Sequence, residues 1–280
     1  MTNTTFDIGG DLRVNRLGFG AMRLPVSTLD GPTRTPENGI AVLRRAMELG
    51  VDHIDTAGFY ERDAVRANEL IRKALHPYRD GLVIATKVGP LRGPNGLPSG
   101  EAPPEGLRAL VEADLRDLGL DRLDLVYLRV GGSLELGTGS IGDRFAALAE
   151  LREEGLIRHL GVSNVDAAQL AEARAIAPVA AVQNNNDGDA GLLAACEAAG
   201  IAFVPFFPIG GGGRPLDAER LGKVASRLGA TVPQVAIAAL LASSPVALAI
   251  PGTGDLGHLE ENQAAGGLEL SDEDLADLRG

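Results

Sequence analysis

Short apolar runs alternate with amphipathic segments along almost the whole chain, and this alternation constrains the fold more than any other feature. The apolar runs are residues 16–21, 51–55, 82–87, 123–128, 157–162, 179–183, 201–206 and 246–250. Apolar residues recur at helical spacing in the segments between and after these runs, at 36–49, 66–75, 104–118, 143–154, 167–176, 189–199, 217–228 and 233–242. Strands that alternate with helices pair in parallel, so we expect an α/β fold with about eight parallel strands.

Glycines mark the ends of several predicted helices. Each follows the last residue of a helical pattern, where a left-handed backbone commonly ends a helix: Gly50, Gly119, Gly155, Gly200 and Gly229. Two further helices are predicted near the C-terminus, at 257–265 and 271–278. Near the N-terminus, strands at 5–8 and 14–17 flank Gly9-Gly10-Asp11, which predicts a β-hairpin.

A chain with this pattern can form an open doubly wound sheet or a closed (β/α)8 barrel. The open dinucleotide-binding sheet uses a Gly-x-Gly-x-x-Gly turn after an early strand. The turn here, Leu17-Gly-Phe-Gly-Ala-Met-Arg23, lacks the third glycine. We therefore predict a (β/α)8 TIM barrel with an N-terminal β-hairpin, as a single domain over residues 1–280. Two long loops follow predicted strands, at 89–104 and 130–142.

Composition argues against several classes of partner. With 26 basic and 38 acidic residues the net charge is −12, which repels a nucleic acid. No apolar run approaches the ~20 residues of a bilayer span. The first residues lack the basic and apolar parts of a signal peptide, so we expect a cytoplasmic protein without a membrane partner. The single cysteine, Cys196, is expected to pack inside a helix layer.

Polar residues stand where the predicted strands end, which is the functional face of a barrel. In chain order they are Asp55 with Tyr60, Lys87, Arg129, Ser163-Asn164, Gln183-Asn184, Phe206-Phe207-Pro208 and Pro251-Gly252-Thr253. Some of them have structural alternatives: Ser163 and Asn164 can cap the next helix, and Gln183 can be a satisfied amide at the barrel rim. As a set they indicate one polar cluster at the mouth of the barrel.

Asp55, Tyr60 and Lys87 together have the composition of a proton donor with its supporting charges. A phenol is a weak acid, and a neighbouring ammonium favours its ionised form. A carboxylate paired with that ammonium fixes where the positive charge lies. The alternative is a surface ion pair beside an unrelated tyrosine.

The remaining strand-end residues suit a nicotinamide dinucleotide. Ser163, Asn164 and Gln183 complement the donors and the acceptor of a carboxamide, and Phe206 offers a flat face for the ring. The glycine run 209–213, followed by Arg214, offers backbone N–H groups to a pyrophosphate. The helix predicted after Thr253 begins where a phosphate can bind.

These residues and motifs resemble those of the aldo-keto reductase family over essentially the full chain. The matching motifs are Leu17-Gly-Phe-Gly-Ala-Met22, His53-Ile-Asp-Thr-Ala57 with Tyr60, Thr86-Lys87, Gly161-Val-Ser-Asn164, Val182-Gln-Asn184 and Ile250-Pro-Gly-Thr253 with Glu261-Asn262. The resemblance implies a monomeric barrel that binds NADPH and reduces a small-molecule aldehyde or ketone. It implies Tyr60 as the proton donor, supported by Lys87 and Asp55. The residues it implies for cofactor binding are Gly20, Ala21, Met22, Asp55, Ser163, Asn164, Gln183, Phe206, Phe207, Gly210, Gly211, Arg214, Gly252, Thr253, His258, Glu261 and Asn262.

Arg129 departs from the family pattern, which usually has a histidine at the end of the fourth strand. Arginine only donates and stays cationic, so it can hold a carbonyl oxygen but cannot exchange a proton at neutral pH. We therefore count it among the catalytic residues as an electrostatic stabiliser. The Leu128-Arg129-Val130 form, together with residues 204–211, is similar to the bacterial pyridoxal reductase branch. That similarity favours a pyridoxal-like aromatic aldehyde as the substrate.

Other departures concern the two ends of the predicted site. Asn185-Asn186-Asp187 stands where relatives commonly have a tyrosine and an asparagine, which predicts an altered pocket floor. Gly252 and His258 stand where many relatives bind the adenosine 2′-phosphate with a lysine and an arginine, and Asp255 between them disfavours a phosphate. NADPH remains first and NADH is a competitor. His53 is expected to be structural, and no residue spacing suggests a metal site.

Two other functions remain open from the sequence. Arg129 and the change at 185–187 are compatible with a dinucleotide-binding barrel of little or no turnover that acts as a regulatory or redox-sensing module. A barrel that binds another phosphorylated ligand through residues 210–214 is the third possibility, but it leaves the Ser-Asn-Gln set without a purpose.

Overall fold

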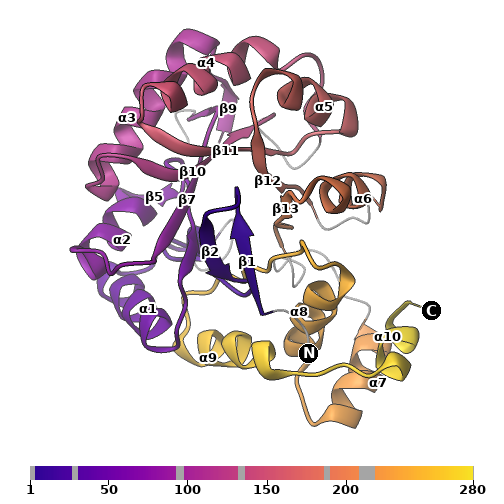
Figure 1. The fold of residues 1–280 in the computed structure, drawn as a ribbon. Helices are drawn as coiled ribbons and strands as arrows, with labels where there is room; N and C mark the ends of the chain where they lie inside the picture. Colours follow the sequence, from indigo (N-terminus) through magenta and orange to yellow (C-terminus); the bar gives the residue numbers. More distant parts are fainter. Residues whose placement is uncertain are drawn as a thin grey trace.

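A curled parallel sheet forms the centre of the computed structural model, which describes residues 4–26, 31–92, 98–131, 136–185, 190–207 and 218–279. The sheet has seven strands in the order β13-β12-β11-β10-β7-β4-β3. It curves around the hairpin of β1 (Thr5–Ile8) and β2 (Leu12–Asn15) (Figure 1). The strand bounds are β3 Phe19–Gly20, β4 His53–Asp55, β7 Val83–Val88, β10 Leu123–Arg129, β11 Ile157–Ser163, β12 Val179–Gln183 and β13 Ala202–Phe203.

The predicted eighth strand closes the ring through isolated bridges. On one side, the Phe203 N–H donates to Val246 O and the Leu248 N–H donates to Phe203 O, both at 2.8 Å. On the other side, the Ala249 N–H donates to Arg16 O and the Gly18 N–H donates to Ala249 O, also at 2.8 Å. Because residues 246–250 thus bond to both edges of the sheet, the expected (β/α)8 barrel is confirmed.

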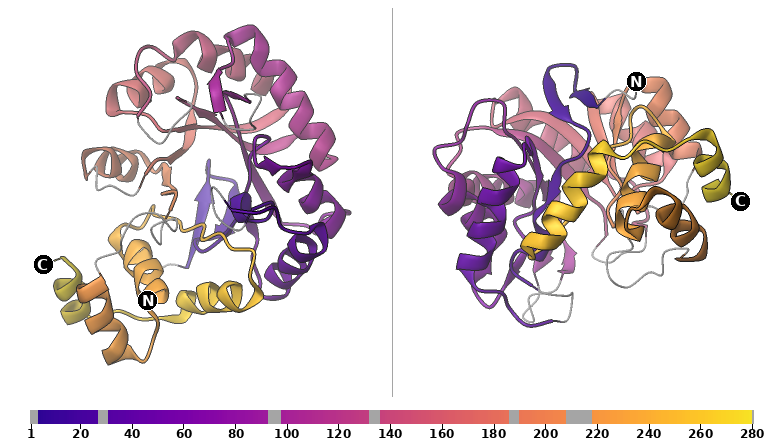
Figure 2. Two further views of the ribbon diagram at one scale, coloured as in Figure 1. Left: turned by 180° about the vertical axis from the view of Figure 1, so that it is seen from behind. Right: turned by 90° about the horizontal axis from the view of Figure 1, so that it is seen from below.

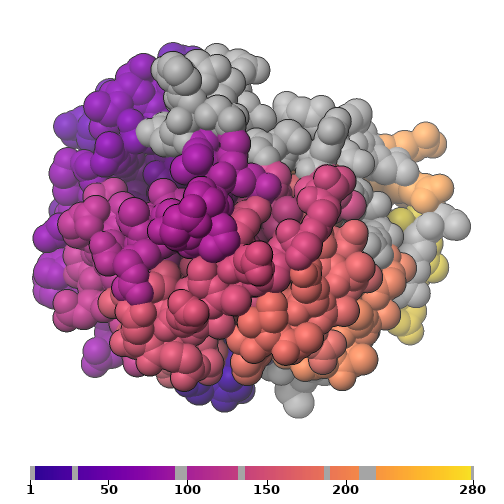
Figure 3. Space-filling view, turned by 90° about the horizontal axis from the view of Figure 1, so that it is seen from above, coloured from indigo at the N-terminus to yellow at the C-terminus, as the bar shows by residue number. Residues whose placement is uncertain are grey.

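Helices form a layer outside the sheet. Their bounds are α1 Pro36–Glu48, α2 Ala67–Leu75, α3 Leu107–Leu118, α4 Gly142–Glu153, α5 Ala167–Ile176, α6 Ala190–Ala199, α7 Ala218–Leu228, α8 Val232–Ser243, α9 Leu256–Ala264 and α10 Asp272–Arg279. The five glycines predicted to end helices all have positive φ, between 61° and 88°. Reciprocal capping boxes begin α5 at Asp166 and α8 at Thr231. Figure 3 shows the outer wall, where the segments from α3 to α6 lie side by side.

Short elements interrupt two of the predicted segments. The long loop at 89–104 contains a hairpin of β8 (Pro90–Arg92) and β9 (Pro98–Glu101). The predicted helix at 104–118 begins with a separate 3-10 turn, η2 (Pro104–Gly106). A further hairpin, β5 (Glu61–Arg62) with β6 (Val65–Arg66), follows Tyr60 directly. Short 3-10 turns, η1 (Ala21–Arg23) and η4 (Ala265–Gly267), follow β3 and α9.

Two apolar layers lie on the two faces of the sheet. The inner layer is built mainly from small and aliphatic side chains inside the barrel, and Ile8, Leu12 and Val14 of the hairpin pack into it. The outer layer joins the sheet to the helices and includes the buried Cys196 on α6. The hairpin bonds to the starts of strands, since Asp11 accepts from Arg158 Nη2 at 2.8 Å and the Asn15 N–H donates to Asp52. It therefore closes the end of the barrel opposite the carboxyl ends of the strands.

The C-terminal helix packs on α7, as both views in Figure 2 show. Arg227 of α7 forms ion pairs with Asp274 and Asp277 of α10. Of the helices that the structure describes, none alone has the length and apolarity of a bilayer span. Residues 219–228 and 232–243 meet that test only when taken together, across a bend of 97°.

Candidate active site

A buried ion pair lies at the carboxyl ends of the neighbouring strands β4 and β7. Lys87 Nζ donates to Asp55 Oδ1 at 2.5 Å and to the Thr56 carbonyl at 2.9 Å. The other oxygen, Asp55 Oδ2, accepts from Gln183 Nε2 of β12 at 2.7 Å. Burial works to lower the pKa of Lys87, but Asp55 and Tyr60 outweigh it and the pKa is raised. Lys87 is therefore a fixed cation at neutral pH.

Tyr60 stands over this cation at the end of the loop that follows β4. Lys87 Nζ lies 4.9 Å from the centroid of the half-buried Tyr60 ring. The backbone of Tyr60 is fixed on both sides, because its N–H donates to Ala57 O at 3.0 Å and its carbonyl accepts from Ala67 N at 2.9 Å. The structure thus brings together Asp55, Tyr60 and Lys87, as the sequence indicated.

Arg129 ends β10 on the other side of the cluster. Its Nη1 donates to Ser163 Oγ at 3.2 Å, and its Cζ lies 5.1 Å from the centroid of the Phe206 ring. Burial lowers the pKa of Arg129, while Tyr60 and Asp55 act to raise it. The guanidinium is therefore in the electrostatic reach of both residues and remains a donor-only cation.

The three amide- and hydroxyl-bearing residues predicted for a carboxamide lie on adjoining strands. Ser163 is in register with Gln183 and with Arg129, and Ser163, Asn164 and Gln183 are all buried. Asn164 takes a positive φ of 63° and its Nδ2 donates to Val130 O at 2.8 Å. Asn184 instead bonds twice to the backbone of Val165, which is a structural role. The amide donors of Asn164 and Gln183 bond to Val130 O and Asp55, whereas Gln183 Oε1 has no partner among the described residues and can accept from a nicotinamide carboxamide.

The other predicted cofactor residues divide between the barrel rim and α9. Gly20 ends β3, and Ala21 and Met22 follow it in η1. A Cβ on Gly20 would lie 2.6 Å from Ile250 O, and one on Gly252 would lie 2.6 Å from Gly20 O, so only glycine fits at either position. Thr253 and Asn262 are buried, Glu261 is half-buried and His258 is exposed. Phe206 and Phe207 meet edge to face, with centroids 5.4 Å apart. Gly210, Gly211 and Arg214 lie outside the described residues.

The first turn of α9 is capped by its own carboxylate. Asp255 accepts from the His258 N–H at 2.9 Å, and this bond lowers the pKa of Asp255. A cation reaches the same loop from the start of α1, because Arg34 Nη1 donates to Gly254 O at 3.0 Å. A Cβ on Gly254 would lie 2.4 Å from Arg34 Nε, so the Arg34 side chain lies directly against this glycine. The residue pattern alone gave no sign that Arg34 and Gly254 meet.

A buried carboxylate behind the ion pair was also missed. Asp114 of α3 is 2% exposed and accepts from Thr86 Oγ1 at 2.6 Å and from Asn68 Nδ2 at 2.9 Å. Its position gives a signal that could have found it. Leu107, Val111 and Leu118 form the inward stripe of α3, and Asp114 interrupts that stripe at helical spacing.

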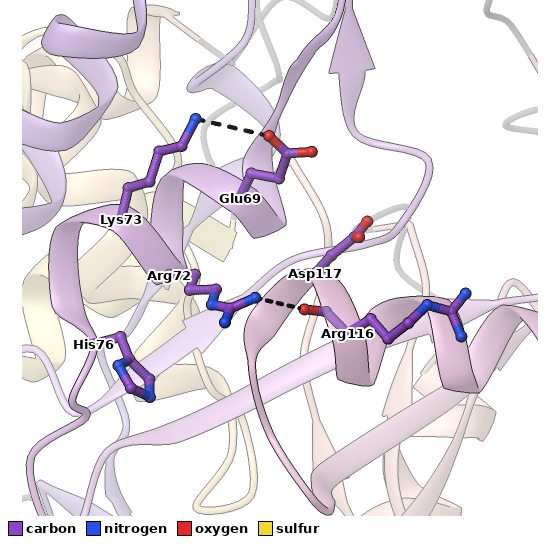
Figure 4. A pocket seen from close by; sticks show the side chains of 6 residues that line it. All are labelled: Glu69, Arg72, Lys73, His76, Arg116 and Asp117. Atoms are coloured by element: carbon purple, nitrogen blue, oxygen red, sulfur yellow. Dashed lines mark hydrogen bonds and ion pairs between the residues drawn. The ribbon is translucent and has the colours of Figure 1, made fainter.

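His53 and an outer groove lie apart from this cluster. His53 is fully buried inside the barrel, and burial lowers its pKa to about 4, in line with the structural role expected for it. An open groove of about 490 Å³ lies between α2 and α3 on the outer surface (Figure 4). It is lined by Glu69, Arg72, Lys73, His76, Arg116 and Asp117. In the described part of the chain, no three His, Cys, Asp or Glu side chains are grouped as metal ligands.

Comparisons with known proteins show which family the chain resembles over its length. Pyridoxine 4-dehydrogenase of Escherichia coli K12 is 46% identical over 100% of this chain and 99% of its own length. An uncharacterized oxidoreductase of Schizosaccharomyces pombe is 40% identical over 96% of this chain and 87% of its own. An aldo-keto reductase from Klebsiella pneumoniae, solved in complex with NADPH, superposes with a TM-score of 0.80 at 26% identity, over 99% of this chain and 94% of that one. Residues 16–280 match the model of the Aldo/keto reductase family. The chain belongs to the aldo/keto reductase family.

Proposed function

We propose that this chain reduces a pyridoxal-like aromatic aldehyde to the alcohol, with NADPH as the reductant and Tyr60 as the proton donor. The observation that carries the proposal is the buried Asp55–Lys87 pair beneath the Tyr60 ring. Membership of the family gives the reaction class, the NADP-dependent interconversion of a carbonyl and an alcohol. The substrate class is supported by the E. coli relative, whose name describes a dehydrogenase of pyridoxine.

When bound, NADPH supplies the hydride that reduces the carbonyl carbon. Ser163, Asn164 and Gln183 hold the carboxamide, and the Phe206 ring offers a face to the nicotinamide. The same Gln183 amide also fixes Asp55, so residues that orient the cofactor and residues that position Lys87 share one hydrogen-bond network. Through Gln183, the position of the nicotinamide is therefore linked to the position of Asp55 and Lys87.

Tyr60 gives its hydroxyl proton to the carbonyl oxygen as the alcohol forms. The negative charge left on Tyr60 is stabilised by Lys87, whose own charge is held in place by Asp55. Arg129 donates toward the same oxygen and stabilises the charge that develops on it. Because Arg129 stays cationic, it contributes electrostatic stabilisation and takes no part in proton exchange.

NADPH is distinguished from NADH by its adenosine 2′-phosphate, and we propose that Arg34 meets that group. The family's usual cations are replaced here by Gly252 and His258, and Asp255 adds a negative charge at the start of α9. Arg34 brings a guanidinium against Gly254 between these positions. Guanidinium groups bind phosphates through several parallel N–H donors.

The function is tested by following NADPH and NADH oxidation with pyridoxal and with a panel of simple aliphatic and aromatic aldehydes. We expect turnover with NADPH, and the highest kcat/KM with pyridoxal or another hydroxylated aromatic aldehyde. Tight NADPH binding without turnover of any carbonyl would contradict the proposal and favour a dinucleotide-binding regulatory barrel. Faster turnover of aliphatic aldehydes would leave the reaction in place and contradict the substrate class.

A further inference from the structure

The outer face of β7 carries a carboxylate that the proposed mechanism does not use. Thr86 and Lys87 are consecutive on β7, so their side chains point to opposite faces of the sheet. Lys87 points into the barrel toward Asp55, and Thr86 points out toward α3, where its hydroxyl donates to Asp114 Oδ2 at 2.6 Å. Asp114 therefore holds Thr86, the neighbour of Lys87, from the outer face of the sheet.

A second chain of hydrogen bonds runs from Asp114 to Thr56, whose carbonyl is the other hydrogen-bond partner of Lys87. Asp114 Oδ1 accepts from Asn68 Nδ2 at 2.9 Å, and Asn68 Oδ1 accepts from Thr56 Oγ1 at 2.7 Å. The carbonyl of that same Thr56 accepts from Lys87 Nζ at 2.9 Å. Asp114 is thus joined through two short chains of hydrogen bonds to the residues next to Asp55 and Lys87.

The loop that carries Tyr60 also rests on Asp114. A Cβ added to Gly58 would lie 2.4 Å from Asp114 Oδ1, so the backbone of the loop passes directly over the carboxylate. Gly58 lies between Thr56, which the network holds, and Tyr60, whose backbone bonds to Ala57 and Ala67. A change in the position of Asp114 would therefore be transmitted to the loop.

Burying Asp114 as a charged carboxylate costs free energy. Burial raises the pKa of Asp114 to about 7, against the hydrogen bonds from Thr86 and Asn68. Two charged groups act on this pKa: Lys87 on β7 lowers it, and Asp117 on α3 raises it. Asp117 Oδ2 itself lies 3.6 Å from Nη1 of Arg66, at the start of α2. An aliphatic side chain would continue the stripe of α3 without this desolvation, so the bonds to Thr86 and Asn68 are what the carboxylate adds.

We propose that Asp114 is a positioning residue of the reductase, which holds the Thr56 carbonyl at Lys87 and fixes the loop that carries Tyr60. The proposal rests on the function proposed above, but it concerns a residue that touches neither the substrate nor the cofactor. Asparagine at this position has the same shape, and its Nδ2 can donate to Thr86 Oγ1, which reverses the direction of that bond. Alanine removes both bonds.

The test compares Asp114→Ala, Asp114→Asn and Thr56→Val with the control Asp117→Asn, which changes a carboxylate one turn away on the same helix. We expect Asp114→Ala to lower kcat by about 10- to 100-fold, the range typical of misplaced catalytic groups, with KM and the NADPH Kd changed less than about threefold. Asp114→Asn should recover most of kcat, because its amide can still bond to Thr86 and to Asn68. The combined Asp114→Ala, Thr56→Val variant should be less impaired than the product of the two single losses.

Hydrogen exchange gives a readout that does not depend on turnover. Peptides that cover residues 56–60 should exchange faster in Asp114→Ala and in Thr56→Val than in the wild type, and unchanged in Asp117→Asn. A folded Asp114→Ala protein with wild-type kcat and wild-type exchange at 56–60 would overturn the proposal. If that variant does not fold, wild-type kcat and exchange in Thr56→Val would overturn it equally. If the wild type reduces no carbonyl, the proposed function fails and the exchange measurement alone decides the role of Asp114.

Discussion

Lys87 shows how single residues determine the chemistry of the site. Its ammonium is buried, so its charge depends on Asp55 Oδ1 and on the Thr56 carbonyl. The motif around Asp55, Tyr60 and Lys87 could be predicted from the sequence because Asp55 and Lys87 lie at the ends of strands and Tyr60 follows in the loop after β4. Asp114 left a signal, since it interrupts the apolar stripe of α3 at helical spacing, but its partners and the contact of Arg34 with Gly254 could not be predicted, because the residues that meet are distant in the chain.

Arg34 provides a prediction about cofactor choice at the scale of one residue. Arg34→Ala should weaken NADPH binding by about 10-fold or more and leave NADH binding within about twofold, because only NADPH carries the 2′-phosphate that a guanidinium would bind. Fluorescence titration with each dinucleotide measures both Kd values. Arg45→Ala is a suitable control, since Arg45 lies further along α1 and pairs with Glu260 on the surface. Equal losses for NADPH and NADH would contradict this role.

His53 provides a prediction about pH. Its folded pKa is lowered to about 4, below the ordinary 6.5, so the unfolded chain binds more protons between these values. The free energy of unfolding is therefore not reduced by His53 above pH 6.5, and it falls as the pH drops from 6.5 toward 4, because the unfolded chain then binds a proton that the folded His53 does not. At about 1.4 kcal/mol per pKa unit, the full shift from 6.5 to about 4 makes the loss at most about 3.5 kcal/mol. Urea unfolding at pH 7.5 and pH 4.5 should show a larger drop in stability for the wild type than for His53→Gln; equal drops would show that His53 does not titrate on unfolding.

At the scale of elements, helices with local end signals were predicted best. The structure has α5 at Ala167–Ile176 and β12 at Val179–Gln183, the same bounds as predicted, and the capping box of Asp166 with Gln169 explains where α5 begins. The sequence predicts a loop where β8 and β9 form a hairpin, because proline and glycine are frequent in that segment. The eighth strand is present only as bridges, because its neighbours at the closure, β13 and β3, are each two residues long.

The close packing where the barrel closes predicts that Gly20 cannot be replaced without a loss of stability. Gly20→Ala should destabilise the protein by at least about 2 kcal/mol, because its Cβ would lie 2.6 Å from the Ile250 carbonyl and must push the strands apart. Gly222→Ala is the matched control, since it stands in α7 with no atom within 4 Å and should stabilise by about 0.5 to 1 kcal/mol. Denaturant unfolding measures both changes. Equal stabilities would contradict the close approach of β3 and residues 250–252.

At the scale of the whole molecule, the two ends of the barrel have different roles. The hairpin of β1 and β2 fills one end with Ile8, Leu12 and Val14, so polar strand ends can converge only at the other. The strand and helix pattern predicted about eight parallel strands, and the missing third glycine in the turn at 17–23 favoured a barrel over an open sheet. It could not give the closing contacts or the second layer behind β7, because these depend on side chains that meet only after the ring has closed.

The central claim is that Tyr60 gives the proton to the reduced carbonyl and that Lys87 and Asp55 support it. The most direct test is single-turnover oxidation of bound NADPH by pyridoxal in the wild type and in Tyr60→Phe, with Tyr78→Phe as the control, since the Tyr78 hydroxyl bonds to Leu118 O on the outer layer. We predict that Tyr60→Phe keeps NADPH binding and loses about 100-fold or more in rate, the range typical of a general acid, while Tyr78→Phe keeps the rate. Wild-type rate in Tyr60→Phe would contradict the account.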